Sequence, residues 1–500
     1  MKIADKNTSA VSLVKAALEK AKKYEDYHVF VSLNAENALR KAAEIDQKIA
    51  RGEKVGRLAG VPYACKDNFL SKEGCTTASS KILEPFCAPI TATAIQKLEA
   101  EGAIMIGRAN LDSFAHGSST ENSYFGPTKN SKDKERVAGG SSGGSAVAVA
   151  LDIVEFATGT DTGGSIRQPA SFNGVYGFKP TYGAISRYGV VAMASSLDCV
   201  GFFAKDPQDI DLLMSICAGQ DPKDTTTLPD YYQQIGDPRR AVEGWPENGV
   251  PPEEAFSEGK SSLGVNFRDR TPKHPCGTSQ FAEYKIGIIK GFDQGLDPEV
   301  KQAYESKIES LKNEGYEVVE LDMPTLKYAL PVYYILCPAE VASNLSRHDG
   351  IRYGFRAEAE SLEDVYGKSR SIGFMPENKR RIMIGNFVLS SGFYDAYYLK
   401  AAQARTLIIK EYDEAFKKCD FILTPVSPNP AFKLGEKTGD PLAMYMEDVL
   451  SVPLNLAGLP GLAIPVGKTK DGLDLGLQIV GPRRSDKALL AFADKIKEEK

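Results

Sequence analysis

The 500-residue sequence predicts an α/β protein in which helices cover a sheet of buried strands. Segments with apolar side chains at the helical spacing i, i+3 and i+4 alternate along the chain with short apolar runs of strand length. An apolar content of 42% and a charged content of 25% are typical of a globular chain that buries a large core. Length alone is compatible with several domains or with one large domain.

The order of the elements follows from these patterns. The first 50 residues predict helix, since residues 13–24 and 35–50 carry the helical spacing. Residues 60–70 then predict a short buried strand that runs into a turn. Further strands are predicted at residues 103–107, 284–290, 316–323, 421–425, 462–467 and 475–480, and further helices at residues 91–102, 297–315 and 395–420.

Residues 233–280 differ in composition from the rest of the chain. They are rich in glycine, proline and charge, and they include Trp245, the only tryptophan. Such a segment predicts a long surface insertion or loop. A loop that docks a partner is the alternative.

Charge and cysteine content narrow the class of protein. With a net charge of −5, the chain does not show the strongly basic composition of a protein that binds nucleic acid by itself. The eight cysteines form no C-x-x-C pair and no zinc pattern, so we expect scattered reduced thiols and no metal site. The sequence shows no signal-peptide core and no run of 18 apolar residues, and we expect a cytoplasmic protein without a membrane span.

Two clusters of glycine and serine, residues 137–150 and 158–170, are the strongest local signals. Small residues let backbone N–H groups converge on one point, which suits a phosphate or a developing oxyanion. Neither cluster contains a P-loop lysine, and neither opens with G-x-G-x-x-G, so a nucleotide site is disfavoured. The remaining alternatives are a purely structural turn and a turn that presents Ser165 as a nucleophile.

A nucleophilic serine needs a base. The four histidines are His28, His116, His274 and His348, and no G-x-S-x-G motif accompanies them, so a Ser-His-Asp triad is disfavoured. Lys66 ends an apolar run, and burial can hold a lysine neutral so that it acts as a base. The alternative is a lysine that reaches solvent and pairs with Asp67.

Three motifs together resemble the amidase signature family: CKDN at Lys66, GGSSGGSA at 139–146 and GTDTGGSIRQPA at 159–170. The resemblance implies one domain over residues 1–500, with a central mixed sheet covered by helices on both faces. It implies that Ser165 is the acylated nucleophile, that Ser141 bridges it to the base Lys66, and that the peptide bond before Ser141 is cis. The N–H groups of Thr162, Gly163, Gly164 and Ser165 would form the oxyanion hole.

Segments 118–130, 186–201, 378–408 and 440–467 are similar to the A subunits of aminoacyl-tRNA amidotransferases, a branch of that family. This likeness implies that Arg381 holds the α-carboxylate of glutamine, that Asp448 holds its α-ammonium, and that Tyr333 or Tyr334 lines the pocket. It implies a glutaminase whose ammonia converts Glu-tRNA(Gln) or Asp-tRNA(Asn) in a heterotrimer with B and C subunits. Charged tRNA, ATP and Mg²⁺ would bind mainly at the B subunit, and this chain would bind no cofactor.

The sequence departs from that pattern at the 233–280 segment, at Ala138, and at His116, which enters a loop near the expected pocket. Two other functions remain open. One is a stand-alone amidase for a small or hydrophobic carboxamide, and the other is an inactive scaffold, against which the intact Lys66, Ser141 and Ser165 argue.

Overall fold

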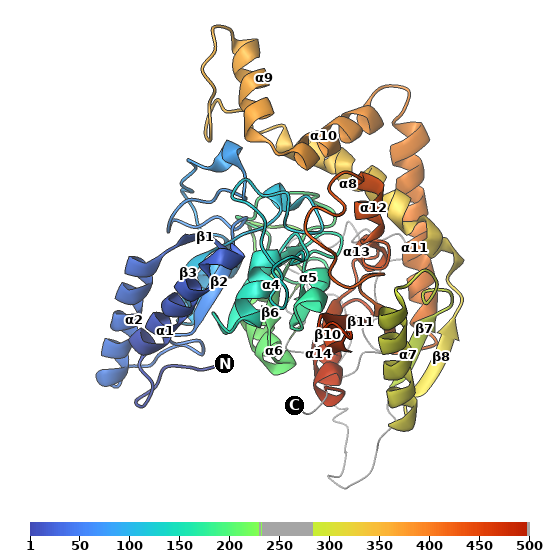
Figure 1. Ribbon diagram of the computed structural model, residues 1–500, viewed down its shortest axis with the longest axis horizontal. Coiled ribbons are helices and arrows are strands. Elements are labelled where there is room, and N and C mark those ends of the chain that lie inside the picture. The colour runs from blue at the N-terminus through green and yellow to red at the C-terminus, as the bar shows by residue number, and fades with distance from the viewer. Residues whose placement is uncertain (230–231, 233–283, 498–500) are drawn as a thin grey trace, which may run out of the picture.

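The computed structural model describes residues 1–229, 232 and 284–497, and within them one 11-stranded sheet forms the centre of the molecule (Figure 1). The strand order is β1-β3-β2-β4-β6-β5-β10-β11-β9-β7-β8. The strands are β1 (Phe30–Leu33), β2 (Pro62–Lys66), β3 (Ile104–Ala109), β4 (Phe156–Asp161), β5 (Tyr176–Lys179), β6 (Cys199–Ala204), β7 (Lys285–Ile289), β8 (Glu317–Leu321), β9 (Phe421–Pro425), β10 (Gly461–Lys468) and β11 (Asp474–Val480).

The sheet is mixed, as predicted. Strand β2 pairs in parallel with β3 and β4, and β7 pairs in parallel with β8 and β9. The other pairings are antiparallel. Every residue of β2, β3, β4 and β6 is buried, because helices cover both faces of this part of the sheet, and this explains the continuous apolar runs.

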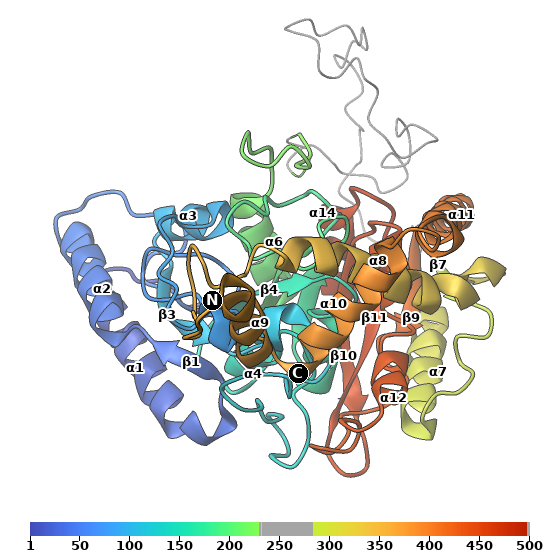
Figure 2. The same cartoon turned by 90° about the horizontal axis from the view of Figure 1, so that it is seen from above.

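Helices lie on both faces of the sheet (Figure 2). Helices α3, α6 and α14 share one apolar core with the strands, and α1, α2, α4 and α5 share another. Helices α8, α11 and α13 share a third core beside the C-terminal strands. The α-helices are α1 (Ala10–Lys23), α2 (Ala35–Ala50), α3 (Thr93–Ala100), α4 (Gly143–Ala150), α5 (Arg167–Phe172), α6 (Pro207–Cys217), α7 (Pro298–Asn313), α8 (Ala329–Leu345), α9 (Leu362–Gly373), α10 (Pro376–Leu389), α11 (Lys400–Ala415), α12 (Pro441–Met446), α13 (Val452–Leu456) and α14 (Asp486–Lys495).

Helix starts follow the local sequence. Asp206 and Asp297 cap α6 and α7 by accepting a hydrogen bond from the N–H two residues later, and a proline follows each cap. An aspartate at this position satisfies an otherwise unpaired N–H, and proline at the first helical position loses no hydrogen bond.

The predicted helices and strands are confirmed except near the N-terminus. The first 50 residues are not all helical, because Phe30–Leu33 form β1 between α1 and α2. This short strand pairs antiparallel with β3 at the edge of the sheet, a long-range contact that local helical spacing does not reveal. The predicted insertion at 233–280 lies outside the described residues. In the part of the chain that the structure describes, no helix is both long enough and apolar enough to cross a membrane.

Parallel pairing decides where chemistry can occur. Strands β2 and β4 end at Lys66 and Asp161, so their carboxyl ends meet at one edge of the sheet. Ligands of open α/β sheets bind outside such carboxyl ends. Both glycine-serine clusters reach this edge, one just before α4 and the other between β4 and α5.

Candidate active site

Lys66 is the last residue of β2 and has no exposed surface. Its Nζ lies 2.9 Å from Ser141 Oγ, 2.7 Å from Ser142 Oγ and 2.8 Å from Thr160 Oγ1. Asp67 turns away and accepts a 2.9 Å hydrogen bond from Arg108 Nε. The alternative of a solvent-reaching lysine paired with Asp67 is therefore wrong.

The surroundings of Lys66 favour the neutral amine. Burial lowers the pKa of Lys66 to about 7, against the opposing effect of the carboxylates of Asp112, Asp161 and Asp198. A neutral amine donates two hydrogen bonds and accepts one. Since the Ser142 hydroxyl donates to the Thr160 carbonyl at 3.3 Å, the hydroxyls of Ser141 and Thr160 are the ones available to donate to the amine.

The first glycine-serine cluster holds Ser141 in place. The Gly140–Ser141 peptide bond is cis, as the family resemblance implied. A Cβ on Gly140 would lie 2.1 Å from Asp112 Oδ2, so only glycine fits there. The Gly140 N–H donates to Gln168 Oε1 at 2.9 Å, which ties this cluster to the second one.

A buried ion pair builds the turn that carries Ser165. Arg167 Nη2 lies 3.0 Å from Asp161 Oδ1, and neither side chain is exposed. The Asp161 carboxylate also accepts from the N–H groups of Gly164 at 2.9 Å and Ile166 at 3.1 Å. Burial alone would raise the pKa of Asp161, but Arg167 beside it holds that pKa well below its usual range. The turn is thus fixed by a charge-assisted network.

The predicted oxyanion hole is only partly available. The Gly164 N–H already donates to Asp161, so a donor role for Gly164 does not fit this geometry. In the described part of the chain, the N–H groups of Thr162, Gly163 and Ser165 form no hydrogen bond. The Thr162 hydroxyl donates to Asp198 Oδ1 at 2.7 Å, which fixes the start of the turn.

Ser165 lies close to Lys66 and its hydrogen-bond partners, but the structure shows no hydrogen bond between the hydroxyls of Ser165 and Ser141 in the described residues. The Ser142 N–H donates to the Ser165 carbonyl at 3.2 Å, and Ser165 is 8% exposed. The roles of Lys66, Ser141 and Ser165 as a catalytic set remain predictions.

Arg381 lies on α10 and is buried against aromatic rings. Its guanidinium carbon is 5.3 Å from the ring centroid of Tyr334 and 5.6 Å from that of Tyr445. Its Nε donates to Glu377 Oε1 at 2.8 Å, one helical turn earlier, and Tyr445 donates to the same carboxylate oxygen at 2.8 Å. Stacking and an ion pair orient the guanidinium.

Asp448 follows α12 and is also buried. Its Oδ1 accepts from Ser118 Oγ at 2.8 Å, and its Oδ2 accepts from Tyr334 OH at 2.7 Å. Burial raises the pKa of Asp448 to about 6, although both hydroxyls favour the ionised form. The structure thus brings Arg381, Asp448 and Tyr334 together. Tyr333 instead packs against the turn that carries Ser165 (residues 162–165, the serine turn), since a Cβ on Gly163 would lie 2.6 Å from the Tyr333 hydroxyl.

A cavity of about 240 Å³ opens beside Arg381. Its lining includes Ser118, which connects it to Asp448, whereas Ser165 is not among the lining residues. His116 also lines it, as the sequence suggested. The His116 Nδ1 lies 2.7 Å from the Phe114 carbonyl, and burial, with Arg381 nearby, lowers the pKa of His116 to about 3. His116 is therefore a neutral group in this cavity.

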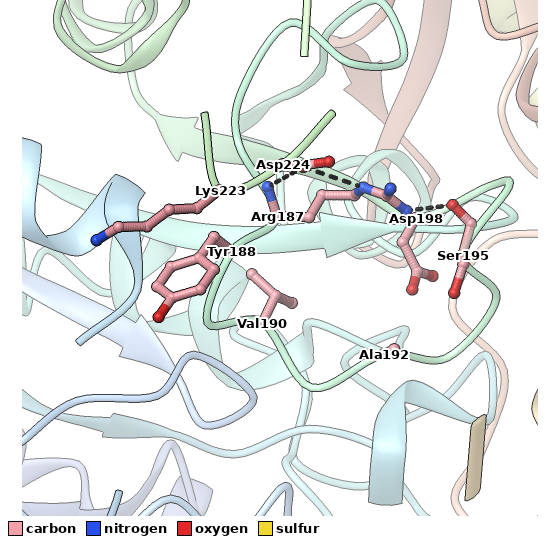
Figure 3. A pocket seen from close by; sticks show the side chains of 8 residues that line it. All are labelled: Arg187, Tyr188, Val190, Ala192, Ser195, Asp198, Lys223 and Asp224. Atoms are coloured by element: carbon pink, nitrogen blue, oxygen red, sulfur yellow. Dashed lines mark hydrogen bonds and ion pairs between the residues drawn. The ribbon is translucent and has the colours of Figure 1, made fainter. Parts of the chain in front are cut away.

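A second cavity of about 210 Å³ is lined by residues that include Arg187, Asp198 and Asp224 (Figure 3). Arg187 pairs with Asp224 in this lining, as the dashed lines of Figure 3 mark, and Asp198 accepts the hydrogen bond from Thr162 described above. The Asp198 carboxylate accepts from the N–H groups of Met193 at 2.9 Å and Ala194 at 3.1 Å. This aspartate connects the second cavity to the first residue of the serine turn.

Sequence reasoning missed several residues of the site. Glu377 could have been found from its spacing, because a glutamate four residues before Arg381 on a helix predicts an ion pair. Arg167 lies within a quoted motif, yet its burial was not foreseen. Asp198 and Tyr445 reach the site only through the fold, and no local pattern points to them.

The chain belongs to the Amidase family, whose model matches residues 12–243 and 271–490. This membership agrees with the buried lysine, the glycine-serine clusters and the mixed sheet described above.

Among similar proteins, the A subunit of glutamyl-tRNA(Gln) amidotransferase from Koribacter versatilis (strain Ellin345) is 45% identical over 498 residues, which are 98% of this chain and 95% of the relative. The protein of the same name from Cyanothece sp. (strain PCC 7425 / ATCC 29141) is 46% identical over 96% of this chain and 92% of its own length. The crystal structure of the A subunit of glutamyl-tRNA(Gln) amidotransferase from Thermotoga maritima superimposes with a TM-score of 0.73 at 35% identity, covering 96% of this chain and 90% of that one.

Proposed function

We propose that this protein is the glutaminase subunit of a tRNA-dependent amidotransferase. It would hydrolyse glutamine and supply ammonia that converts Glu-tRNA(Gln), or Asp-tRNA(Asn), to the amidated form. The observation that carries the proposal is the buried Lys66, hydrogen-bonded to Ser141 at 2.9 Å beside the Ser165 turn, in a chain whose near full-length relatives are named as amidotransferase A subunits.

The proposed chemistry needs no histidine. Ser165 Oγ attacks the side-chain carboxamide carbon of glutamine, Ser141 takes its proton, and neutral Lys66 receives a proton from Ser141. The resulting ammonium returns a proton to the leaving group, which departs as NH₃, and water then hydrolyses the acyl-enzyme. The N–H groups of Thr162, Gly163 and Ser165 would donate to the developing oxyanion.

The proposed recognition rests on charge. Arg381 would form paired hydrogen bonds with the α-carboxylate of glutamine through the N–H edge of its guanidinium, because the aromatic rings hold its faces and only its Nε donates to Glu377 within the described residues. Asp448 would hold the α-ammonium, because it accepts from neutral hydroxyls and forms no ion pair within the described residues. A bound ammonium would favour its ionised form.

Exposed apolar side chains on α10 and α11 support a partner interface on these helices. Met383 and Phe387 on α10 are 72% and 48% exposed, and Leu407 on α11 is 55% exposed. Both helices pack against α8 at the periphery of the molecule (Figure 1). We propose that B and C subunits complete the enzyme, and that ATP, Mg²⁺ and charged tRNA bind mainly to the B subunit.

The test is co-purification of the full chain from its native source, followed by glutamate release from glutamine with and without ATP and charged tRNA. We expect partner subunits to co-purify, and we expect turnover to rise when both additions are present. Each charged tRNA is supplied separately, which distinguishes the Glu and Asp substrates. Hydrolysis of small hydrophobic amides in preference to glutamine, by a chain that purifies alone, would establish the stand-alone amidase instead.

A further inference from the structure

Two cysteines lie in contact on a surface loop that none of the chemistry above uses. Cys75 Sγ is 3.0 Å from Cys87 Sγ, and both thiols are free. Cys75 is partly exposed and Cys87 is exposed, whereas the other described cysteines are buried. Neighbouring thiols that solvent can reach are the ones that oxidants and disulfides attack.

The backbone holds the two thiols together at the base of the loop formed by residues 75–87. The Thr76 N–H, next to Cys75, donates to the carbonyl of Phe86, next to Cys87, at 3.0 Å. Bond formation therefore requires little loss of chain entropy, because the ends of the loop already meet. The sulfurs need only a small approach to reach bonding distance.

The inner side of the loop is fixed to Asp67, which follows β2, and to Arg108 of β3. The Thr77 N–H donates to Asp67 Oδ2 at 3.1 Å, and Arg108 donates to Thr76 Oγ1 at 2.6 Å. These groups are buried, and they adjoin Lys66 through Asp67. Because the thiols are at the solvent side and these anchors are internal, closing the loop would leave Lys66 in place.

The outer side of the loop supports a distant segment of the chain. Ser80 Oγ donates to the Gly373 carbonyl at 2.8 Å, and the Phe355 N–H donates to the Ile82 carbonyl at 2.8 Å. The Phe86 ring packs against Tyr353, with centroids 5.3 Å apart. The loop thus joins the edge of the sheet to α9 and the segment before it.

We propose that Cys75 and Cys87 are a redox modification site, at which a low-molecular-weight disulfide such as oxidised glutathione forms a reversible bond that closes the 75–87 loop. The bond stabilises the contact between this loop and α9 without altering the reaction at Ser165. The inference does not depend on the identity of the amide substrate.

The chemistry balances in two exchanges. The Cys87 thiolate attacks one sulfur of oxidised glutathione, forms a mixed disulfide and releases one glutathione thiolate. The Cys75 sulfur, after losing its proton to water, attacks Cys87 Sγ and releases the second glutathione. The protein loses two electrons and two protons, and oxidised glutathione becomes two molecules of reduced glutathione. Cys87 acts first because it is the more exposed of the two thiols, and the hydrogen bond between them raises the pKa of the Cys75 thiol to about 11.

The test treats the full-length protein with oxidised glutathione and digests it with trypsin without reduction. Cleavage after Lys72, Lys81 and Lys97 places Cys75 in peptide 73–81 and Cys87 in peptide 82–97. We expect these peptides to be linked, the link to disappear with dithiothreitol, and the thermal midpoint to rise by about 3 °C on oxidation.

The single variants Cys75→Ser and Cys87→Ser are the matched controls. Each should carry glutathione on its remaining thiol, with no linked peptides and no rise in thermal midpoint. Glutathione on Cys87 of the wild-type protein without linked peptides would overturn the proposal, and so would linked peptides with an unchanged midpoint. A loss of amidase turnover in oxidised wild type, but not in oxidised Cys75→Ser, would contradict the claim that Lys66 is undisturbed.

Discussion

The charged groups behind the Ser165 turn and those around Arg381 are both buried, yet they are neutralised differently. Arg167 bonds to Asp161 and also donates to Asn455 Oδ1 and Gln478 Oε1, each at 2.6 Å, so protein groups complete the network. In the part of the chain that the structure describes, Arg381 has one ion pair, with Glu377, and otherwise faces aromatic rings. In the described residues the side-chain carboxylate of Asp448 accepts only from hydroxyls.

The two regions differ in whether their charged groups can still bind a charged ligand. A completed network has no capacity for an external charge, but it fixes backbone N–H groups where a reaction needs them. A carboxylate and a guanidinium that retain bonding capacity can take opposite charges from a ligand. The first region is therefore organised for chemistry and the second for recognition of an amino acid.

The largest expected effect tests the chemistry of the first region. In Ser165→Ala, we expect glutamine turnover to fall by at least about 10³-fold, because the nucleophile is lost. The thermal midpoint should stay that of wild type, since the Ser165 hydroxyl makes no hydrogen bond within the described residues. Steady-state glutamate release and thermal unfolding measure the two quantities. Ser171→Ala, which removes another buried hydroxyl of the same segment, should keep activity; wild-type turnover in Ser165→Ala would refute the nucleophile assignment.

The next effect compares the two arginines directly. Arg167→Met leaves Asp161 buried without a cation, and we expect the free energy of unfolding to fall by about 3–5 kcal/mol. Arg381→Met should cost clearly less, because Glu377 keeps its contacts with Arg380 and Tyr445. Chemical denaturation of both variants measures the costs. Equal losses would show that the two regions do not differ in how their charges are compensated.

A smaller effect separates binding from chemistry. In Arg381→Lys and in Asp448→Asn, we expect the KM for glutamine to rise by roughly 10–100-fold, with a smaller change in kcat, since each variant loses a charge-assisted contact. Asp448→Asn should also lose the preference for glutamine over glutaric acid monoamide, which lacks the ammonium. The glutamine assignment fails if both variants retain the wild-type KM.

The smallest expected effect is the change in kcat/KM for each pH unit. Because burial lowers the pKa of Lys66 to about 7, its neutral form is lost as pH falls through that value, and kcat/KM should drop about tenfold per pH unit. Burial also raises the pKa of Asp112 to about 7. The midpoint of the pH profile therefore describes the joint titration of Lys66 and Asp112. Below about 6 the slope should steepen as Asp448 gains a proton. Asp448→Asn should remove only the steeper part, and a flat profile would contradict a lysine base.

Much of the fold was predictable, because buried strands and amphipathic helices carry their spacing in the local sequence. The strand at Phe30–Leu33 was not, since its pairing with β3 depends on residues that are distant in sequence. The same division applies to the site. Lys66 and the two glycine-serine clusters carry motifs, whereas Asp198 and Tyr445 carry none.

The sequence by itself determined the chemical groups: a lysine at the end of an apolar strand, two serine-bearing glycine turns, and no histidine in a nucleophile motif. Tertiary structure decided their states. Parallel pairing of β2 with β4 brought Lys66 beside Ser141, and burial lowered the pKa of Lys66. The Gly164 N–H, which the motif assigned to an oxyanion hole, donates to Asp161 instead. The reason is physical: protonation and hydrogen bonding depend on what surrounds a group in space, and only the fold assembles those surroundings.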